Sequence, residues 1–184
     1  GEEKRTARTS SGFSGANGRN HASGLTSIYS EFPLEHRIKS SNKFEKRYFC
    51  MKKIVVIGGG TMGLDIAQVF AKKGFDVVVR DISDEIIQAS EARLNKSLDK
   101  LVAKGKMDEA GKAAITGKIA FTTDLNLAAD ADLVVEAAIE NLDIKKGIFA
   151  ELDKICKPET ILASNTSSIS ITAIAAATKR ADKF

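Results

Sequence analysis

The 184-residue sequence has few of the residues that mark a metal site, a disulfide framework or a membrane span. Its two cysteines, Cys50 and Cys156, lie far apart and form no C-x-x-C pair, which favours a reducing compartment and offers no metal site. No apolar run approaches the roughly 18 residues that a transmembrane helix needs. We therefore expect a soluble, cytoplasmic protein without a metal centre or a membrane partner.

Charge of one sign is in excess only near the N-terminus. Residues 1–50 carry nine Lys or Arg against five Asp or Glu, whereas residues 51–184 carry nineteen of each, so the first segment holds the whole net charge of +4. The basic pI therefore gives no argument for nucleic acid as a partner. Residues 1–50 also show no sustained period of two or 3.6 residues, which predicts a disordered leader.

Three explanations compete for this leader. Its Arg and Ser content resembles that of an organelle transit peptide, but its five acidic residues argue against one, and it lacks the apolar core of a secretory signal. The third explanation is that Met51 is the natural start and that residues 1–50 are not native, because MKKIVVIGGG resembles the opening of a bacterial domain. We favour the third explanation, which makes residues 51–184 the folded domain.

A short β-branched strand runs directly into a glycine turn at 54–63, IVVIGGGTMG. The spacing of Gly58, Gly60 and Gly63 is that of a dinucleotide-binding strand-turn-helix. In this motif the first glycine makes the tight turn, the second lets the backbone approach the pyrophosphate, and the third lets the helix pack close to the strand. The amide groups at the start of the helix then meet the phosphate charge. The motif predicts a nicotinamide or flavin dinucleotide as cofactor.

The surrounding sequence supplies the context that the motif needs, with a helix predicted over 64–73 and a second strand over 77–80. Asp81 ends this strand eighteen residues after Gly63, where a carboxylate can accept both hydroxyls of the adenosine ribose. This favours NAD over NADP. Two alternatives stay open: Arg80 could turn outward to meet a 2′-phosphate, and Asp81 could be a turn residue at the strand end.

Apolar runs alternate with helical patterns from Met51 onward, which predicts an α/β fold with a doubly wound parallel (Rossmann) sheet. A helical hairpin interrupts the alternation between the second and third strands. Ser83 is its predicted N-cap, Gly105 ends its first helix, and its second helix lies near 108–114. The apolar stripe of the first helix comprises Ile87, Leu94, Leu98 and Leu101. The remaining strands are predicted at 119–121, 133–136 and 161–163, and the last two flank a helix with Ile144, Ile148, Leu152 and Ile155 at helical spacing.

Polar side chains follow the fourth and fifth predicted strands, and ligands of such a sheet bind outside the carboxyl ends of its strands. The fourth strand leads to Glu140 and Asn141, and the fifth leads to five consecutive hydrogen-bonding side chains, SNTSS at 164–168. This run is interpreted equally well as a ligand contact or as a polar loop that caps the helix starting near Ser170.

Histidine is missing from the part of the sequence that is expected to fold. Oxidising an alcohol to a ketone requires a group that takes the proton, most often a histidine, and both histidines lie in the leader, His21 and His36. The base is therefore either a carboxylate such as Glu140 or a residue beyond Phe184. Because five strands fall short of the expected six, we expect the domain to be truncated before its last strand.

Four stretches together resemble the L-3-hydroxyacyl-CoA dehydrogenase family, and within it the bacterial 3-hydroxybutyryl-CoA dehydrogenases. They are VIGGGTMG at 56–63, VRDI at 79–82, DLVVEAAIENLDIKKGIF at 132–149 and PETILASNTSSISIT at 158–172. The resemblance covers 51–184, which corresponds to the N-terminal NAD-binding domain of the family. It implies an oxidoreductase that transfers a hydride between NAD and C3 of a short-chain 3-hydroxyacyl-CoA or 3-oxoacyl-CoA.

The resemblance also implies roles for individual residues. Asp81 would bind the adenosine ribose, and Glu140 and Lys145 would lie at the nicotinamide side of NAD. Ser167 would touch both cofactor and substrate near the reactive carbon, and Ser97 and Lys104 on the hairpin match positions that contact coenzyme A. The pyrophosphate would be held by Gly58, Gly60, Thr61, Met62 and Gly63.

In the family, the catalytic histidine follows a few residues after the position at which this chain ends. A helical C-terminal domain, absent here, supplies much of the substrate cleft and of the dimer interface. The resemblance therefore implies that the full-length enzyme is a homo-oligomer and that this chain binds NAD weakly without turnover. Two alternatives stay open: another NAD-dependent hydroxyacid dehydrogenase on the same fold, and a non-catalytic nucleotide-binding module.

Overall fold

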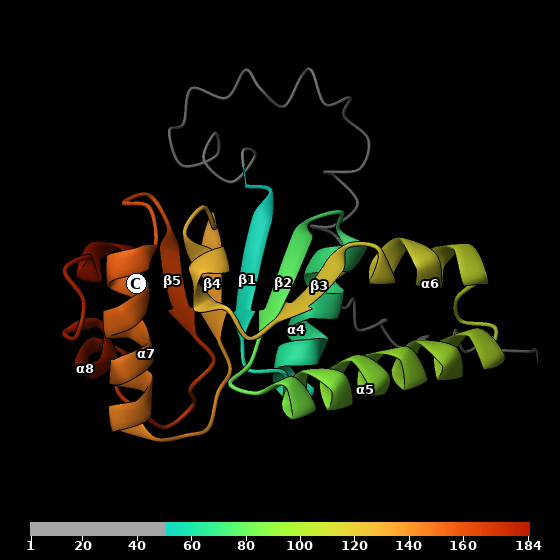
Figure 1. Ribbon diagram of the computed structural model, residues 1–184, viewed down its shortest axis with the longest axis horizontal. Helices are drawn as coiled ribbons and strands as arrows, with labels where there is room; N and C mark the ends of the chain where they lie inside the picture. Colours follow the sequence, from blue (N-terminus) through green and yellow to red (C-terminus); the bar gives the residue numbers. More distant parts are fainter. Residues whose placement is uncertain (1–50) are drawn as a thin grey trace, which may run out of the picture. The chain divides into compact units, whose positions relative to one another are not determined.

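The computed structural model describes residues 51–184, which form a five-stranded parallel sheet in the order β3-β2-β1-β4-β5. The chain passes from β1 to β2 and β3 on one side, and then to β4 and β5 on the other (Figure 1). All neighbouring strands are parallel. This confirms the predicted doubly wound α/β class. The strands are β1 (Lys53–Ile57), β2 (Asp76–Arg80), β3 (Ile119–Thr122), β4 (Leu133–Glu136) and β5 (Ile161–Ser164).

Helices connect these strands, and the predicted helical hairpin between β2 and β3 is confirmed. It projects past the β3 edge of the sheet (Figure 1). One 3₁₀ turn, η1 (Leu125–Ala128), was not predicted. The leader predicted over 1–50 lies outside the described residues. The helices are α4 (Thr61–Lys72), α5 (Asp84–Ala103), α6 (Glu109–Thr116), α7 (Leu142–Ile155) and α8 (Ile171–Ala175), with a 3₁₀ turn η2 (Ala181–Lys183) near the end.

Both faces of the sheet are covered, so the central strand is apolar on both sides. Successive side chains of a strand point to opposite faces. Ile54 and Val56 of β1 join one core with α4, α5 and α6, whereas Val55 and Ile57 join a second core with α7 and α8. A strand buried on both faces reads as a continuous apolar run instead of an alternating one. This is why IVVI at 54–57 predicts a central parallel strand.

Helix α7 buries the predicted apolar stripe only in part: Leu152 lies in the second core and Ile148 packs against it, but Ile144 does not. Lys145, Phe149 and Leu152 are its buried residues, whereas Ile144 is 42% exposed. Ile144 lines a cavity at the carboxyl edge of the sheet, whereas Ile148 both lines this cavity and packs against the second core. Helical spacing of apolar residues indicates one apolar face, but it does not distinguish a face that packs on a sheet from a face that lines a pocket.

We predict that Leu98→Ala lowers the free energy of unfolding by about 2–5 kcal/mol, because Leu98 is fully buried where α5 packs on the sheet. The exposed Leu127 provides the matched control, and Leu127→Ala is expected to cost less than about 1 kcal/mol. Urea unfolding followed by circular dichroism measures both. Equal losses for the two variants would contradict the packing of the hairpin on the sheet.

Candidate functional site

A cavity of about 560 Å³ opens at the carboxyl edge of the sheet, where the chain divides between the two halves. The glycine turn after β1 forms its floor. One wall comprises the end of β2 and the first turns of α5, and the other comprises the segment after β4 and the start of α7. Ligands of doubly wound sheets bind at this topological switch point. The cavity therefore lies where the sequence predicts the dinucleotide.

Two glycines of the turn accept no side chain without a shift of the backbone. Gly58 has a φ of 107°, in the left-handed region, and a Cβ there would lie 2.6 Å from the carbonyl oxygen of Ala137. A Cβ on Gly63 would collide with the carbonyl oxygen of Gly58 and would lie 3.4 Å from Val56 Cγ1. The tight turn and the close approach of α4 to β1 are thus both present, as the motif predicts.

The N-terminus of α4 is left open toward the cavity. Its N-cap residue, Gly60, provides no side-chain hydrogen bond, and a Cβ placed on Gly60 would meet nothing within 4 Å. The other α-helices of the described chain are each capped by a side chain: Ser83 for α5, Asp108 for α6, Asn141 for α7 and Ser170 for α8. The first amides of α4, which include those of Thr61 and Met62, therefore form a site suited to an anion.

Asp81 joins the end of β2 to the glycine turn. Its Oδ2 accepts a hydrogen bond from the Gly59 amide at 2.6 Å, and its Oδ1 accepts one from the Ile82 amide at 2.7 Å. The carboxylate also lines the cavity, where its remaining lone pairs face a ligand. Arg80 lines the same cavity, and its Nε donates to the carbonyl oxygen of Thr123 at 3.2 Å. The two side chains on which the choice between NAD and NADP depends are therefore neighbours at one site.

Ser90 supports the turn from α5 and was not singled out from the sequence. It is buried, and its Oγ lies 2.8 Å from the carbonyl oxygen of Gly59 and 2.7 Å from that of Ile86. A Cβ on Gly59 would collide with this hydroxyl, so the turn and the helix are in direct contact. In the sequence, Ser90 occupies a position of the apolar stripe of α5, between Ile87 and Leu94. A polar residue in such a stripe was the pattern that could have indicated its role.

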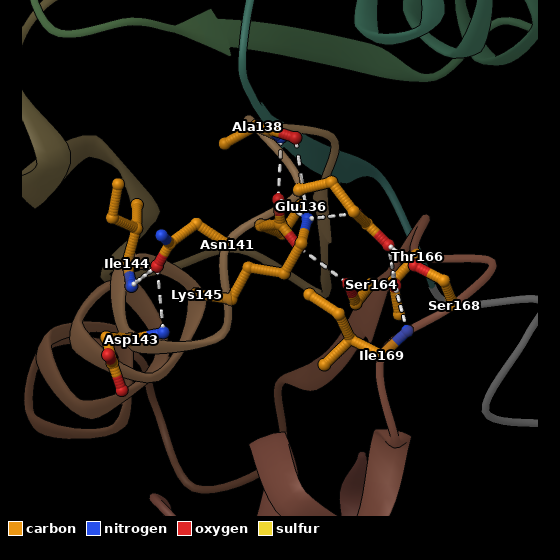
Figure 2. A network of polar contacts seen from close by, with 11 residues as sticks. Glu136, Ala138, Asn141, Asp143, Ile144, Lys145, Ser164, Thr166, Ser168 and Ile169 are labelled. Atoms are coloured by element: carbon orange, nitrogen blue, oxygen red, sulfur yellow. Dashed lines mark hydrogen bonds and ion pairs between the residues drawn. The ribbon is translucent and has the colours of Figure 1, made fainter.

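A second polar network lies at the carboxyl ends of β4 and β5 (Figure 2). Its centre is Glu136, which is 0% exposed and ion-paired to Lys145, which is 1% exposed. Lys145 Nζ and the Ala138 amide donate to Glu136 Oε1 at 2.7 and 2.6 Å, and Ser164 Oγ donates to Oε2 at 2.6 Å. Strand pairing brings Glu136 and Ser164 side by side. Because a buried charge without its partner is strongly destabilising, the network holds the two strand ends together.

Glu140 extends this network to the surface. Its Oε2 lies 3.3 Å from Lys145 Nζ, and its Oε1 accepts hydrogen bonds from Thr166 Oγ1 and from Ser168 Oγ, the latter at 2.9 Å. The Thr166 and Ser168 hydroxyls, followed by Lys145, lower the pKa of Glu140 from 4.5 to about 2. A carboxyl group with so low a pKa is a weaker general base at neutral pH than an ordinary carboxylate, which argues against Glu140 as the proton acceptor.

Ser167 lies exposed between the two hydroxyl donors, Thr166 and Ser168. Within residues 51–184 its hydroxyl has no hydrogen-bond partner and is free to meet a ligand. Helix α8 is capped by Ser170, whose Oγ accepts from the Ala173 amide at 3.3 Å, so the SNTSS run is not needed as the cap. Ser164, Thr166 and Ser168 of this run are engaged with Glu136 and Glu140, and a contact of the run with a ligand stays a prediction.

Ser97 and Lys104 lie outside the cavity. Both are exposed on α5 or directly after it, seven residues apart and therefore on one side of the helix. Arg93, one turn before Ser97, lines the cavity and connects the two regions. The predicted residues thus form a glycine turn with Asp81, a cluster around Glu140 with Lys145 and Ser167, and a separate stripe along α5.

No helix of residues 51–184 is long and apolar enough to cross a membrane. The same residues contain no group of three or more His, Cys, Asp or Glu side chains with the geometry of a metal site. The one cysteine in this part, Cys156, is buried and unpaired, and its burial raises the pKa of the thiol.

Comparison with known proteins shows the family of this chain. The family model for the 3-hydroxyacyl-CoA dehydrogenase, NAD binding domain, matches residues 53–184. A 3-hydroxybutyryl-CoA dehydrogenase of Clostridioides difficile is 49% identical over 131 residues, which is 71% of this chain and 47% of that protein. The mitochondrial hydroxyacyl-coenzyme A dehydrogenase of Homo sapiens is 45% identical over 141 residues, which is 73% of this chain and 45% of that protein.

A solved structure agrees with these sequence relatives. The (S)-3-hydroxybutyryl-CoA dehydrogenase of Ralstonia eutropha superposes with a TM-score of 0.71 and 45% identity, over 73% of this chain and 47% of that one. The chain therefore belongs to the 3-hydroxyacyl-CoA dehydrogenase family, represented by its NAD-binding domain, and its cofactor is NAD. It spans about half the length of the curated relatives that it matches. The open N-terminus of α4 and the Asp81 carboxylate fit the pyrophosphate and the adenosine ribose of that cofactor.

We predict that Gly60→Ala abolishes NAD binding while the free energy of unfolding stays within about 1 kcal/mol of the wild type. The added methyl group meets no protein atom but enters the space expected for the pyrophosphate. Gly63→Ala is the comparison variant, because its methyl group collides with the Gly58 carbonyl and should destabilise the fold itself. Calorimetric titration with NAD and urea unfolding measure the two effects. Full NAD affinity in a folded Gly60→Ala protein would contradict this placement of the cofactor.

We predict that Glu140 titrates with a pKa of about 2 and not near 4.5. Because the folded-state pKa is depressed, the stabilisation that Glu140 gains from its partners is complete above pH 4.5 and is lost as the pH falls through about 2. Carboxyl carbon NMR measures the titration directly. Thr166→Val, which removes the largest contributor, should raise the pKa toward 4.5, and an unchanged pKa in that variant would refute the assigned cause.

Proposed function

We propose that this chain is the cofactor-binding part of a dehydrogenase that transfers a hydride between NAD and C3 of a short-chain 3-hydroxyacyl-CoA or 3-oxoacyl-CoA. The observation that carries the proposal is the cavity at the switch between β1 and β4, which joins the open N-terminus of α4 to the carboxylate of Asp81. Membership of the 3-hydroxyacyl-CoA dehydrogenase family narrows the reaction to this class.

The residues of the cavity have separable tasks in binding the cofactor. The first amides of α4 hold the pyrophosphate, and Asp81 accepts the hydroxyls of the adenosine ribose. Ile82, Ile86 and Ile144, which line the cavity, exclude water from the adenine. When bound, NAD supplies the nicotinamide that accepts or returns the hydride.

The substrate is held from two directions in this proposal. Ser167, whose hydroxyl is free, hydrogen-bonds the substrate oxygen next to the nicotinamide. Ser97 and Lys104 bind the coenzyme A, in which the phosphates offer a site for the Lys104 ammonium group. Their exposure on α5 leaves both side chains accessible to a ligand of this size.

The proton acceptor of the reaction is not provided by residues 51–184. This part of the chain contains no histidine, and the low pKa of Glu140 argues against it as the base at neutral pH. We infer that the chain binds NAD and acyl-CoA but does not turn them over. Cytoplasmic location and assembly into an oligomer through a further domain stay predictions.

The same absence of histidine favours a second candidate, a nucleotide-binding module without catalytic function. Binding of acyl-CoA separates the two candidates, because a module that binds only NAD has no use for Ser97 and Lys104.

We predict that the chain binds acetoacetyl-CoA in the presence of NAD and that Lys104→Ala weakens this binding by roughly tenfold, the usual effect of losing one charge-assisted hydrogen bond. Affinity for NAD should not change. Lys106→Ala, another exposed lysine just beyond the helix, is the matched control and should bind as the wild type does. Calorimetric titration measures all three proteins. No binding of acetoacetyl-CoA would favour the module. In a separate assay with NADH in place of NAD, clear oxidation of NADH by acetoacetyl-CoA would show that the chain carries its own proton donor.

A further inference from the structure

The cluster of charged side chains at the ends of β4 and β5 contains one carboxylate more than the ion pair that joins the two strand ends requires. Glu136, Lys145 and Glu140 are in direct contact, with Lys145 Nζ at 2.7 Å from Glu136 and 3.3 Å from Glu140. Two carboxylates around one ammonium group leave one negative charge. The next ionisable residues along α7, Asp143 and Lys146, have one charge of each sign and cancel.

Hydrogen-bond donors surround both carboxylates of the cluster. Glu136 is fully buried, and it accepts hydrogen bonds from the Lys145 ammonium group, the Ala138 amide and the Ser164 hydroxyl, all within 2.7 Å. Glu140 is stabilised as an anion by the Thr166 and Ser168 hydroxyls, which hold its pKa at about 2. Glu140, the exposed member of the cluster, is therefore an anion across the physiological pH range.

The position of the charge relates it to one half of the cofactor. Asp81 at the end of β2 marks the adenosine side, and the open N-terminus of α4 marks the pyrophosphate. A dinucleotide that crosses the switch point then places its other half over β4 and β5. The cluster lies at the ends of these two strands, where Figure 2 shows Glu136, Lys145 and Ser164. The Glu140 side chain is 42% exposed.

The two oxidation states of the cofactor differ in charge at this end. The nicotinamide ring of NAD⁺ is a cation, and the ring of NADH is neutral. Inside a partly desolvated site, a nearby unit charge acts on the cation and has little effect on the neutral ring. A site with one excess negative charge therefore binds the two forms with different affinity for an electrostatic reason.

We propose that the Glu136–Lys145–Glu140 cluster selects the oxidation state of the cofactor, favouring the cationic nicotinamide of NAD⁺ over the neutral nicotinamide of NADH. Glu140 is the exposed charge that faces the ring. Glu136 is a positioning residue: it neutralises and immobilises Lys145, so that the negative charge of Glu140 remains uncompensated. The proposal rests on the proposed function only in that the chain must bind NAD.

The test is the ratio of dissociation constants for NAD⁺ and NADH, measured by calorimetry and by NADH fluorescence on the full 184-residue chain. Glu140→Gln keeps an oxygen that accepts from Thr166 and Ser168 but removes the charge. It should weaken NAD⁺ by roughly three- to tenfold and change NADH by less than about twofold. Glu136→Gln should shift the ratio in the same direction, because Lys145 then compensates Glu140.

The matched control is Glu151→Gln, which removes an exposed charge from α7, eleven residues after Glu140 in the sequence, and should leave the ratio unchanged. If Glu136→Gln does not fold, Glu140→Gln alone decides, since its side chain is partly exposed. Equal weakening of NAD⁺ and NADH, or an unchanged ratio in Glu140→Gln, overturns the proposal and leaves the proposed function intact. Failure of the wild-type chain to bind either form overturns both.

Discussion

The contact between Gly63 of α4 and the backbone of Gly58 is the constraint on which the rest of the site depends. Only a residue without a side chain lets the helix approach the strand this closely. The approach brings the first amides of α4 to the carboxyl edge of the sheet, where a partial positive charge is exposed to an anion. The open N-cap at Gly60, the carboxylate of Asp81 and the buried Ser90 are all arranged around this turn. The cavity follows from their packing.

The two halves of the sheet present different kinds of interaction at its carboxyl edge. On the β2 side, the backbone amide of Gly59 and one carboxylate form a short-range, hydrogen-bonded cradle. On the β4 and β5 side, a buried ion pair holds two polar loops together and leaves a net charge near the surface. Burial makes this pair expensive to break, so the loops around Ser167 keep their geometry. In the binding that we propose, recognition of the dinucleotide is mostly geometric at one end and electrostatic at the other.

Most of the fold was predictable from the sequence, and so was the part of the site that comprises the glycine turn and Asp81. The apolar strands, the glycine spacing, the Ser83 cap and the apolar stripe of α5 are local patterns, so their positions were predicted within a few residues. The glycine turn and Asp81 were found because their spacing is part of one motif. Glu136 and Ser90 were not singled out, since a polar residue at an apolar position reveals its partner only when distant segments meet. Ile144 of α7 was misinterpreted because a residue that lines a pocket and a residue that packs in a core have the same apolar pattern.

The order of residues by itself determined the α/β class, the helical hairpin, the dinucleotide turn and the family. These depend on hydrophobic periodicity, on glycine spacing and on short runs of identity, which are properties of neighbouring residues. Only the tertiary structure decided that Lys145 is buried against Glu136, that Glu140 is held by Thr166 and Ser168, and that α4 alone among the described α-helices begins without a side-chain cap. These ion pairs and hydrogen bonds join the end of β4 to α7 and to the loop after β5, segments from nine to 28 residues apart. Such contacts arise only once the sheet has aligned its strand ends.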